Sequence, residues 1–327
     1  MSAPQADEKA TEPQPNPTFT PKVGQWVAVR SAKAIIATLD QHGCLDGLPF
    51  MPEMIPLCGK QLRIKRFANK TCVNADSVYI GTLENCVILQ SSQRCDGAAH
   101  GGCEMGCQFI WKTDWLVELP ENHTAPPTET PTDQDIDQAT NHRIAENAFA
   151  DKANNKYRCQ QTELVQIANP IGPLKLKQYI DDNRRDNISI FAITSFLCSL
   201  VTKKLFRQSD SLAGPHPKRT PTQTLALQVG QRVRVKSLEQ IRETLDVNGS
   251  NRGLWFDPKE MGDFCGKEMV VSRKITKLID EKTGFLRQLK EPTVVLSETE
   301  CSGVFRRFCS RGMLHFWREI WLEEVSQ

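Results

Sequence analysis

The chain has 327 residues, and its 41 basic and 39 acidic side chains leave a formal net charge of +2 at neutral pH. A chain of this length can form two or three hydrophobic cores, so disulfides are not required for folding. The near-neutral balance excludes a global field that would attract nucleic acid or anionic lipid, so any such partner must be bound by a local patch.

The first twenty residues are rich in Pro, Gln and Glu, and they lack the basic and apolar regions of a secretory signal. We therefore expect a disordered tail over residues 1–20 and a cytoplasmic protein. The most apolar run, Ile188–Val201, is shorter than the roughly 20 residues that cross a bilayer. No transmembrane segment is expected, and peripheral membrane contact by this run is not favoured.

An internal repeat organises the rest of the chain. The segment Val23–Ser31 recurs as Val229–Ser237, and both contain Val-Gly-Gln followed by alternating valines. Further matches follow in the same order, pairing Cys58, Cys95, Gly97, Cys103, Trp111 and Trp115 with Cys265, Cys301, Gly303, Cys309, Trp317 and Trp321. So many ordered matches predict a duplication, with copy 1 in residues 21–120 and copy 2 in residues 227–327.

Each copy is predicted to be a small β-domain, because apolar residues at alternate positions are typical of half-buried strands. A short helix follows the first strand, over Ser31–Asp40 in copy 1 and Ser237–Asp246 in copy 2, each with a serine N-cap. About five short strands per copy are typical of an SH3-like barrel, with the paired tryptophans in its core. The expected fold class is therefore α+β, with two tandem SH3-like β-barrels joined by a helical middle segment.

The region between the copies divides by composition. Residues 121–140 are rich in Pro, Thr and Asp and are predicted to be a linker. Residues 141–210 are predicted to be helical, in two stretches of roughly Asn141–Ala168 and Lys175–Arg207 that can form a helical hairpin. Residues 211–226 form a second predicted linker.

Seven of the twelve cysteines lie between Cys44 and Cys107. Without a secretory signal, clustered thiols are more typical of metal or redox sites than of structural disulfides. The densest stretch is Arg94–Cys107, where glycines and small residues let the backbone wrap around an ion. We predict a structural zinc site there, with three cysteines of this stretch and a fourth ligand from Cys72 or from the histidine: the candidate ligands are Cys72, Cys95, His100, Cys103 and Cys107.

Copy 2 keeps Cys265, Cys301 and Cys309, but Ile279, Arg306 and Met313 stand at the places of Cys72, His100 and Cys107. A four-ligand site of the copy-1 kind cannot form from these residues. Copy 2 is therefore predicted to be a degenerate, metal-free partner. Its remaining cysteines either pack as small buried side chains or form a different site with His315.

Two family resemblances accompany these residues. The stretch Cys95–His100 resembles the cluster-binding motif of the CDGSH iron-sulfur family, in which three cysteines and one histidine hold a two-iron cluster. This chain has one extra residue before the histidine and lacks the upstream Cys-x-Cys pair. The resemblance implies an iron-sulfur cluster as the alternative to zinc. Copy 1 and the segment Tyr157–Leu164 also resemble a family of cysteine-rich bacterial proteins to which no activity is attached.

The sequence contains no Gly-x-Ser-x-Gly, Walker loop, dinucleotide fingerprint or His-Glu-x-x-His motif. The favoured function is therefore non-enzymatic: a zinc-containing protein that acts as a binding or scaffold module for a protein partner. One alternative is a redox or metal-dependent enzyme that uses the Cys95–Cys107 loop through an open metal position or a reactive thiolate. A further alternative is nucleic-acid binding through basic clusters on the barrels, such as Arg63–Arg66.

Overall fold

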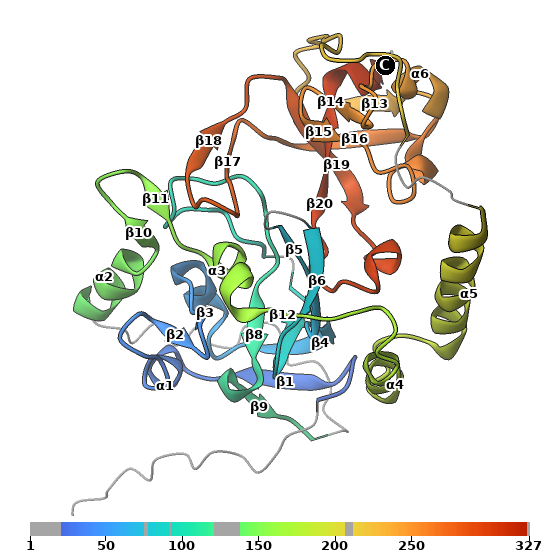
Figure 1. The fold of residues 1–327 in the computed structure, drawn as a ribbon. Helices are drawn as coiled ribbons and strands as arrows, with labels where there is room; N and C mark the ends of the chain where they lie inside the picture. The colour runs from blue at the N-terminus through green and yellow to red at the C-terminus, as the bar shows by residue number, and fades with distance from the viewer. Residues whose placement is uncertain (1–20, 75–77, 92, 121–137, 207–211, 326–327) are drawn as a thin grey trace, which may run out of the picture.

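Two five-stranded antiparallel sheets, one from each copy, form the framework of the molecule (Figure 1). The computed structural model describes residues 21–74, 78–91, 93–120, 138–206 and 212–325. The copy-1 sheet has the order β8-β7-β4-β1-β9, with strands β1 (Trp26–Val29), β4 (Gln61–Phe67), β7 (Cys86–Leu89), β8 (Ile110–Lys112) and β9 (Leu116–Glu118). The copy-2 sheet has the order β20-β19-β16-β13-β21, with strands β13 (Arg232–Val235), β16 (Glu268–Lys274), β19 (Thr293–Glu300), β20 (Leu314–Arg318) and β21 (Leu322–Glu324).

The two sheets repeat each other in register as well as in order. Trp26 pairs with Arg63 in copy 1, and the corresponding Arg232 pairs with Val270 in copy 2. The structure contains both helices and strands, so the predicted α+β class is confirmed. The SH3-like closure predicted from sequence is not shown by the described ladders, because β8 and β9 stand at opposite edges of the sheet order, as do β20 and β21.

Smaller elements accompany each sheet. Copy 1 adds α1 (Ala32–Ile36), β2 (Cys44–Leu45), β3 (Leu48–Pro49), η1 (Pro52–Leu57), the hairpin β5 (Lys70–Asn74) and β6 (Val78–Thr82), and η2 (Thr113–Trp115). Copy 2 adds α6 (Leu238–Arg242), β14 (Ser250–Asn251), β15 (Leu254–Trp255), η3 (Gly262–Phe264), the hairpin β17 (Lys277–Ile279) and β18 (Leu286–Gln288), η4 (Val304–Arg306) and η5 (Glu319–Trp321). The predicted serine caps are present, since Ser31 and Ser237 accept the N–H groups of Ala34 and Gln240.

The middle segment differs from the predicted helical hairpin. It comprises α2 (Gln138–Glu146), β10 (Phe149–Asp151), β11 (Lys156–Tyr157), α3 (Gln160–Ile167), β12 (Asn169–Pro170), α4 (Lys177–Arg184) and α5 (Ile190–Phe206). The expected continuous helix over Asn141–Ala168 is interrupted by the β10–β11 hairpin, whose turn contains Asn155 at a φ of 52°. Asparagine tolerates this left-handed conformation better than most residues, which favours a turn there.

Only some of the predicted domain boundaries fall within the described residues. The predicted tail, residues 1–20, lies outside the described residues, as does most of the linker 121–140, although α2 already begins at Gln138. The second predicted linker contains no helix or strand over residues 212–226.

Among the described helices, none combines the length and the apolar character that crossing a membrane would require.

Two tryptophans close the core of each copy, as predicted: Trp111, Trp115, Trp317 and Trp321 are all at most 1 % exposed. The Phe50 ring meets Trp115 edge-on at a centroid distance of 5.5 Å, and Phe256 meets Trp321 in the same way at 5.4 Å. Edge-to-face packing is the favoured geometry for buried aromatic rings. The duplicated sequence therefore builds the same core twice.

The two copies pack on each other through reciprocal contacts. We name residues 94–107 cysteine loop 1 and residues 301–313 cysteine loop 2. In cysteine loop 1, Cys103 Sγ accepts the Ile279 N–H at 3.3 Å, and Glu104 N–H donates to the Lys277 carbonyl at 3.1 Å. In cysteine loop 2, the equivalent Cys309 Sγ accepts the Cys72 N–H at 3.0 Å, and Ser310 N–H donates to the Lys70 carbonyl at 2.9 Å.

Each hairpin therefore packs on the cysteine loop of the other copy: β5–β6 on cysteine loop 2, and β17–β18 on cysteine loop 1 (Figure 1). This self-complementary pattern is that of an isologous dimer contained within one chain.

Candidate metal site

Cysteine loop 1 connects β7 to β8 and folds back on itself. The N–H of Cys95 donates to the Cys107 carbonyl at 2.9 Å, so the two ends of the loop meet. Gly97 has a φ of +73°, and a Cβ atom there would lie 2.3 Å from the Cys103 carbonyl oxygen. Only glycine permits both this conformation and this close approach. The glycines of the sequence motif thus allow the loop to bring its cysteines together.

Three side chains at this loop form a compact group of metal-ligating atoms. One ligand atom each from Glu53, Cys95 and His100 lies within 4.8 Å of the other two. His100 is 2 % exposed; its Nδ1 lies 3.1 Å from Glu53 Oε1, and its Nε2 lies 3.4 Å from Cys95 Sγ. This group can hold a metal ion.

Glu53 belongs to η1 and lies next to Nδ1 of His100, the ring nitrogen that does not contact Cys95. Burial by itself raises the pKa of Glu53, but interactions with the His100 ring and the Ala99 N–H, which donates at 3.0 Å, lower it below its ordinary value. The resulting carboxylate favours the tautomer with a proton on Nδ1. The lone pair of Nε2 is then directed toward Cys95. Carboxylate-histidine pairs of this kind orient histidines that bind metals.

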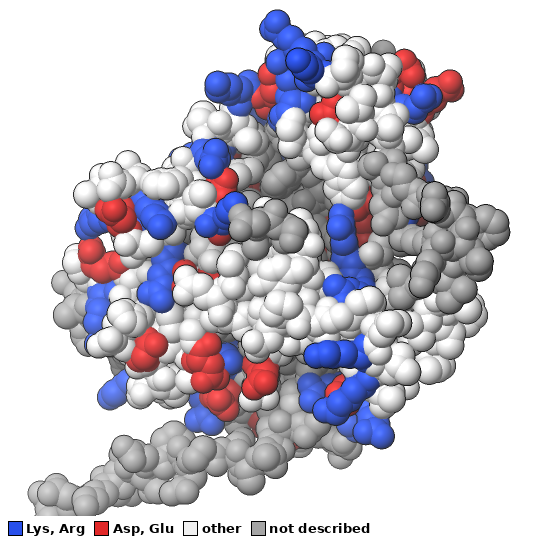
Figure 2. Space-filling view, viewed as in Figure 1, with Lys and Arg blue, Asp and Glu red and all other residues white. Residues whose placement is uncertain are grey.

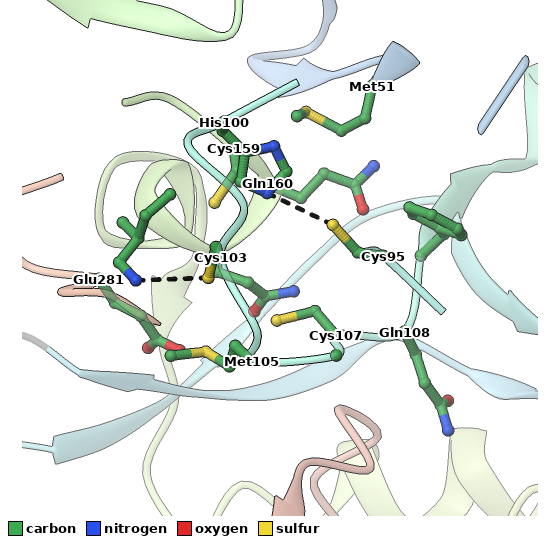
Figure 3. Close-up of a pocket in the computed structure, with 14 residues that line it drawn as sticks. Met51, Cys95, His100, Cys103, Met105, Cys107, Gln108, Cys159, Gln160 and Glu281 are labelled. Atoms are coloured by element: carbon green, nitrogen blue, oxygen red, sulfur yellow. Dashed lines mark hydrogen bonds between the residues drawn. The ribbon is translucent and has the colours of Figure 1, made fainter. Parts of the chain in front are cut away.

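Four cysteines surround a small cavity beside this group, and their sulfurs turn toward a common space (Figure 3): Cys95, Cys103, Cys107 and Cys159. The space open to the centre of a water molecule is about 30 Å³, enough for one or two waters or a single ion. Ile279 and Glu281 of copy 2 also line the cavity. The site therefore lies where copy 1, the middle segment and copy 2 meet.

Cys159 is brought to the cavity by α3, of which it is the N-cap residue. Its N–H donates to the Thr162 hydroxyl at 3.0 Å. The neighbouring Gln160 side chain bridges the N–H and the carbonyl of Ile110 in β8, both at 2.8 Å. These contacts fix the start of α3 against the copy-1 sheet, so the position of Cys159 is set by the fold.

The four thiols are protonated when no metal is bound. Burial raises the pKa of Cys159 to about 11, and it raises those of Cys95, Cys103 and Cys107 as well. The nearby backbone N–H groups of Gly97 and Met105 act in the opposite direction on the pKa values of Cys95 and Cys103, and the Ile279 N–H donates to Cys103 Sγ at 3.3 Å. Such donors stabilise the charged sulfur once a cation is present.

The structure brings four of the five predicted ligands to the cavity and places the fifth elsewhere. Cys95, His100, Cys103 and Cys107 line the cavity, whereas the Sγ of Cys72 lies 3.1 Å from the Sγ of Cys309. Because the hairpins are exchanged between the copies, the residue that contacts Cys103 here is Ile279, the copy-2 counterpart of Cys72.

Glu53 and Cys159 lie at the site but are not among the predicted ligands. For Glu53, a signal exists in the repeat, because copy 2 keeps the same Glu-Met pair as Glu260-Met261. Glu260 likewise binds its own cysteine loop, accepting the Ser302 N–H at 2.8 Å. For Cys159, the signal is its place at the start of a helix, but nothing local connects it to a loop fifty-two residues earlier.

No family model and no curated protein matches this chain. The resemblances to the CDGSH family and to the cysteine-rich bacterial family are thus still predictions.

Proposed function

We propose that this chain is a zinc protein in which four of the five donors around the cavity, His100 and the thiolates of the four cysteines, hold a structural ion, with Glu53 supporting the histidine. The observation that carries the proposal is the placement of Cys95 and His100. Zinc bonds of about 2.3 Å to sulfur and about 2.0 Å to nitrogen, at a tetrahedral angle, separate the two ligand atoms by about 3.5 Å. The observed separation of Cys95 Sγ and His100 Nε2 is 3.4 Å.

The donor chemistry supports a closed, structural site. Thiolate and imidazole are the ligands of structural zinc, and catalytic zinc keeps an open position for water. Five such donors surround this cavity, from Cys95, His100, Cys103, Cys107 and Cys159, so four bonds can be filled by the protein alone. This favours a binding or scaffold role over a metal-dependent enzyme.

The proposed ion would join segments that are distant in sequence. Cysteine loop 1 and α3 would supply ligands, while the N–H of Ile279 in β17 donates to Cys103 Sγ. The ion would therefore fix the middle segment and the copy-2 hairpin against copy 1. We propose that each copy is an SH3-like barrel and that the ion holds the two barrels in one orientation, so that the chain acts as a scaffold.

The first prediction concerns metal content. Anaerobically purified protein is expected to contain about one zinc per chain with no visible absorption band, as measured by elemental analysis and spectroscopy. Chelation should lower the free energy of unfolding by about 3 kcal/mol, relative to protein kept at roughly a hundred times the zinc dissociation constant. Iron with sulfide and a visible band would instead support the cluster. Protein without stoichiometric metal would contradict the proposal.

A second prediction follows from the raised thiol pKa values. Because the cavity thiols are neutral in the apoprotein at pH 7 and zinc binds thiolates, binding should release about three to four protons per ion. Zinc affinity should therefore rise with pH and fall in acid. Calorimetric titration in buffers of different ionisation enthalpy measures the number of protons released. A value near zero would exclude thiolate ligation, as would an affinity that does not change between pH 6 and pH 8.

An apolar surface supports a protein partner for this scaffold. Large apolar side chains are exposed in and around α4 and the start of α5, with Leu174 81 % and Phe191 80 % exposed, together with Leu176, Ile180 and Ile190. Exposed apolar clusters are typical of interaction surfaces.

Nucleic-acid binding receives less support. Lys65 and Arg66 already pair with Glu300 at 3.0 Å and 3.6 Å, and Figure 2 shows acidic and basic side chains interspersed over the face in view.

A further inference from the structure

A second pair of cysteines lies between the two copies, away from the cavity. Cys72 belongs to β5 of copy 1 and Cys309 to cysteine loop 2, and their sulfurs are 3.1 Å apart. Neither residue lines the proposed zinc site. We propose that Cys72 and Cys309 form a reversible disulfide that covalently joins the two copies. This inference is independent of the zinc proposal.

The backbone already holds the two residues in position. Besides the Cys72 N–H to Cys309 Sγ contact, the Ser310 hydroxyl donates to the Lys70 carbonyl at 2.7 Å, and Arg311 Nη1 donates to the Cys72 carbonyl at 2.9 Å. A disulfide needs the sulfurs about 2 Å apart, so an approach of about 1 Å is sufficient. The hydrogen bonds on both sides of the pair hold the two segments next to each other.

The surroundings favour a reactive thiolate at Cys72. The Cys309 thiol donates a hydrogen bond to the Cys72 sulfur, and this bond, together with the nearby Arg311 guanidinium, lowers the pKa of Cys72. The same hydrogen bond raises the pKa of Cys309. Arg311 is itself held by an ion pair with Glu281 and is 6 % exposed. One sulfur is thus prepared to attack while the other retains its proton, as in dithiols that exchange with disulfides.

A small oxidant can reach the pair. Cys72 is partly exposed, and Cys309 lines a cavity in which about 340 Å³ is open to the centre of a water molecule. Polar side chains form much of the cavity wall, including Lys65, Arg66, Ser302 and Ser310. A polar cavity of this size can admit part of a small disulfide such as oxidised glutathione.

The reaction balances with that oxidant. The Cys72 thiolate attacks one sulfur of the small disulfide, whose S–S bond breaks, giving a mixed disulfide on Cys72 and one thiolate that takes up a proton. Cys309 then loses its proton and attacks the Cys72 sulfur. The Cys72–Cys309 bond forms, and the second small thiol leaves. Two electrons pass from the protein to the oxidant, and the two small thiols take up one proton from Cys309 and one from solvent.

Copy 1 shows why only one such bond forms. At the equivalent place, Cys103 contacts the N–H of Ile279, whose side chain carries no sulfur. Both copies therefore keep the contact between a hairpin and a cysteine loop, but only the contact of Cys72 with Cys309 joins two cysteines. A disulfide at Cys72–Cys309 would lock the β5–β6 hairpin onto cysteine loop 2, which in the reduced protein is held there by non-covalent contacts.

The test uses the full chain as purified, with its metal. The protein is equilibrated in mixtures of reduced and oxidised glutathione, free thiols are blocked with N-ethylmaleimide, and peptides are analysed by mass spectrometry. We expect a peptide cross-linked between Cys72 and Cys309 to appear as the mixture becomes oxidising. Both free thiols should be lost together, and both should return with dithiothreitol.

Two variants sharpen the test. In Cys309→Ser, Cys72 should accumulate a glutathione adduct that the unaltered chain does not retain. The control Cys265→Ser removes a copy-2 cysteine outside the pair and should leave the cross-link unchanged. The proposal is overturned if Cys72 and Cys309 both remain fully blocked by N-ethylmaleimide in the most oxidising mixture, or if Cys72 links mainly to another cysteine. Formation of the cross-link in metal-free protein would support this inference even if the zinc proposal failed.

Discussion

Cys159→Ser is expected to weaken zinc binding, because it removes one of the five donors around the cavity, whereas Cys72→Ser should bind about one zinc per chain with unchanged affinity. The sulfur of Cys159 faces the cavity shared by Cys95, Cys103 and Cys107 (Figure 3). The sulfur of Cys72 instead contacts Cys309 between the copies. Replacing sulfur by a hydroxyl removes a soft ligand in the first variant and leaves the ligand set complete in the second.

Elemental analysis and zinc titration of both purified variants measure this difference, and circular dichroism shows whether each is folded. The two substitutions are chemically identical, so Cys72→Ser is the matched control for Cys159→Ser. The structural assignment would be wrong if Cys72→Ser lost the ion and Cys159→Ser bound it as tightly as the unaltered chain, which is the result expected if Cys72, and not His100, were the fourth ligand.

Lys70→Met is expected to lower the free energy of unfolding by about 3–5 kcal/mol, because it leaves a buried carboxylate without its cation. The side chains of Lys70 and Asp182 form an ion pair and are both 0 % exposed. Lys70 Nζ also lies 5.0 Å from the centre of the Tyr179 ring and 5.3 Å from that of Phe308. The pair therefore ties β5 to α4 and to the region of cysteine loop 2.

Urea denaturation of the metal-loaded protein measures this effect. Lys177→Met is the control, since Lys177 pairs with Asp181 in the same helix but its side chain is 89 % exposed; a change within about 0.5 kcal/mol is expected there. The double variant Lys70→Met, Asp182→Leu should recover part of the loss, because no unpaired charge remains buried. A loss below about 1 kcal/mol in Lys70→Met would show that the carboxylate finds water or another partner.

Local sequence patterns were sufficient to predict the repeated unit. The alternating valines of Val27–Val29 and Val233–Val235 became β1 and β13, paired in equivalent registers. The serine caps at Ser31 and Ser237 begin helices in both copies, although these end four residues earlier than predicted. Just beyond these helices, the hydroxyls of Thr38 and Thr244 donate to carbonyls of the last helical turn, those of Ile35 and Ile241. Such side-chain bonds compete with helix continuation.

The candidate site was predictable only in part. Cys95, His100, Cys103 and Cys107 lie within one loop, where glycines such as Gly97 let the backbone fold tightly, so their convergence follows from the sequence itself. The sequence by itself thus determined the duplication, the tryptophan cores and the cysteine loop, because these depend on short-range periodicity and on residues close together in the chain.

Only the tertiary structure decided which distant residues complete each cluster. Cys159 reaches the cavity because α3 docks on β8 through Gln160, and Cys72 leaves it because each hairpin packs on the opposite copy. Both placements depend on how separate elements pack, and packing is set by the summed contacts of whole surfaces, which no local pattern of the chain encodes.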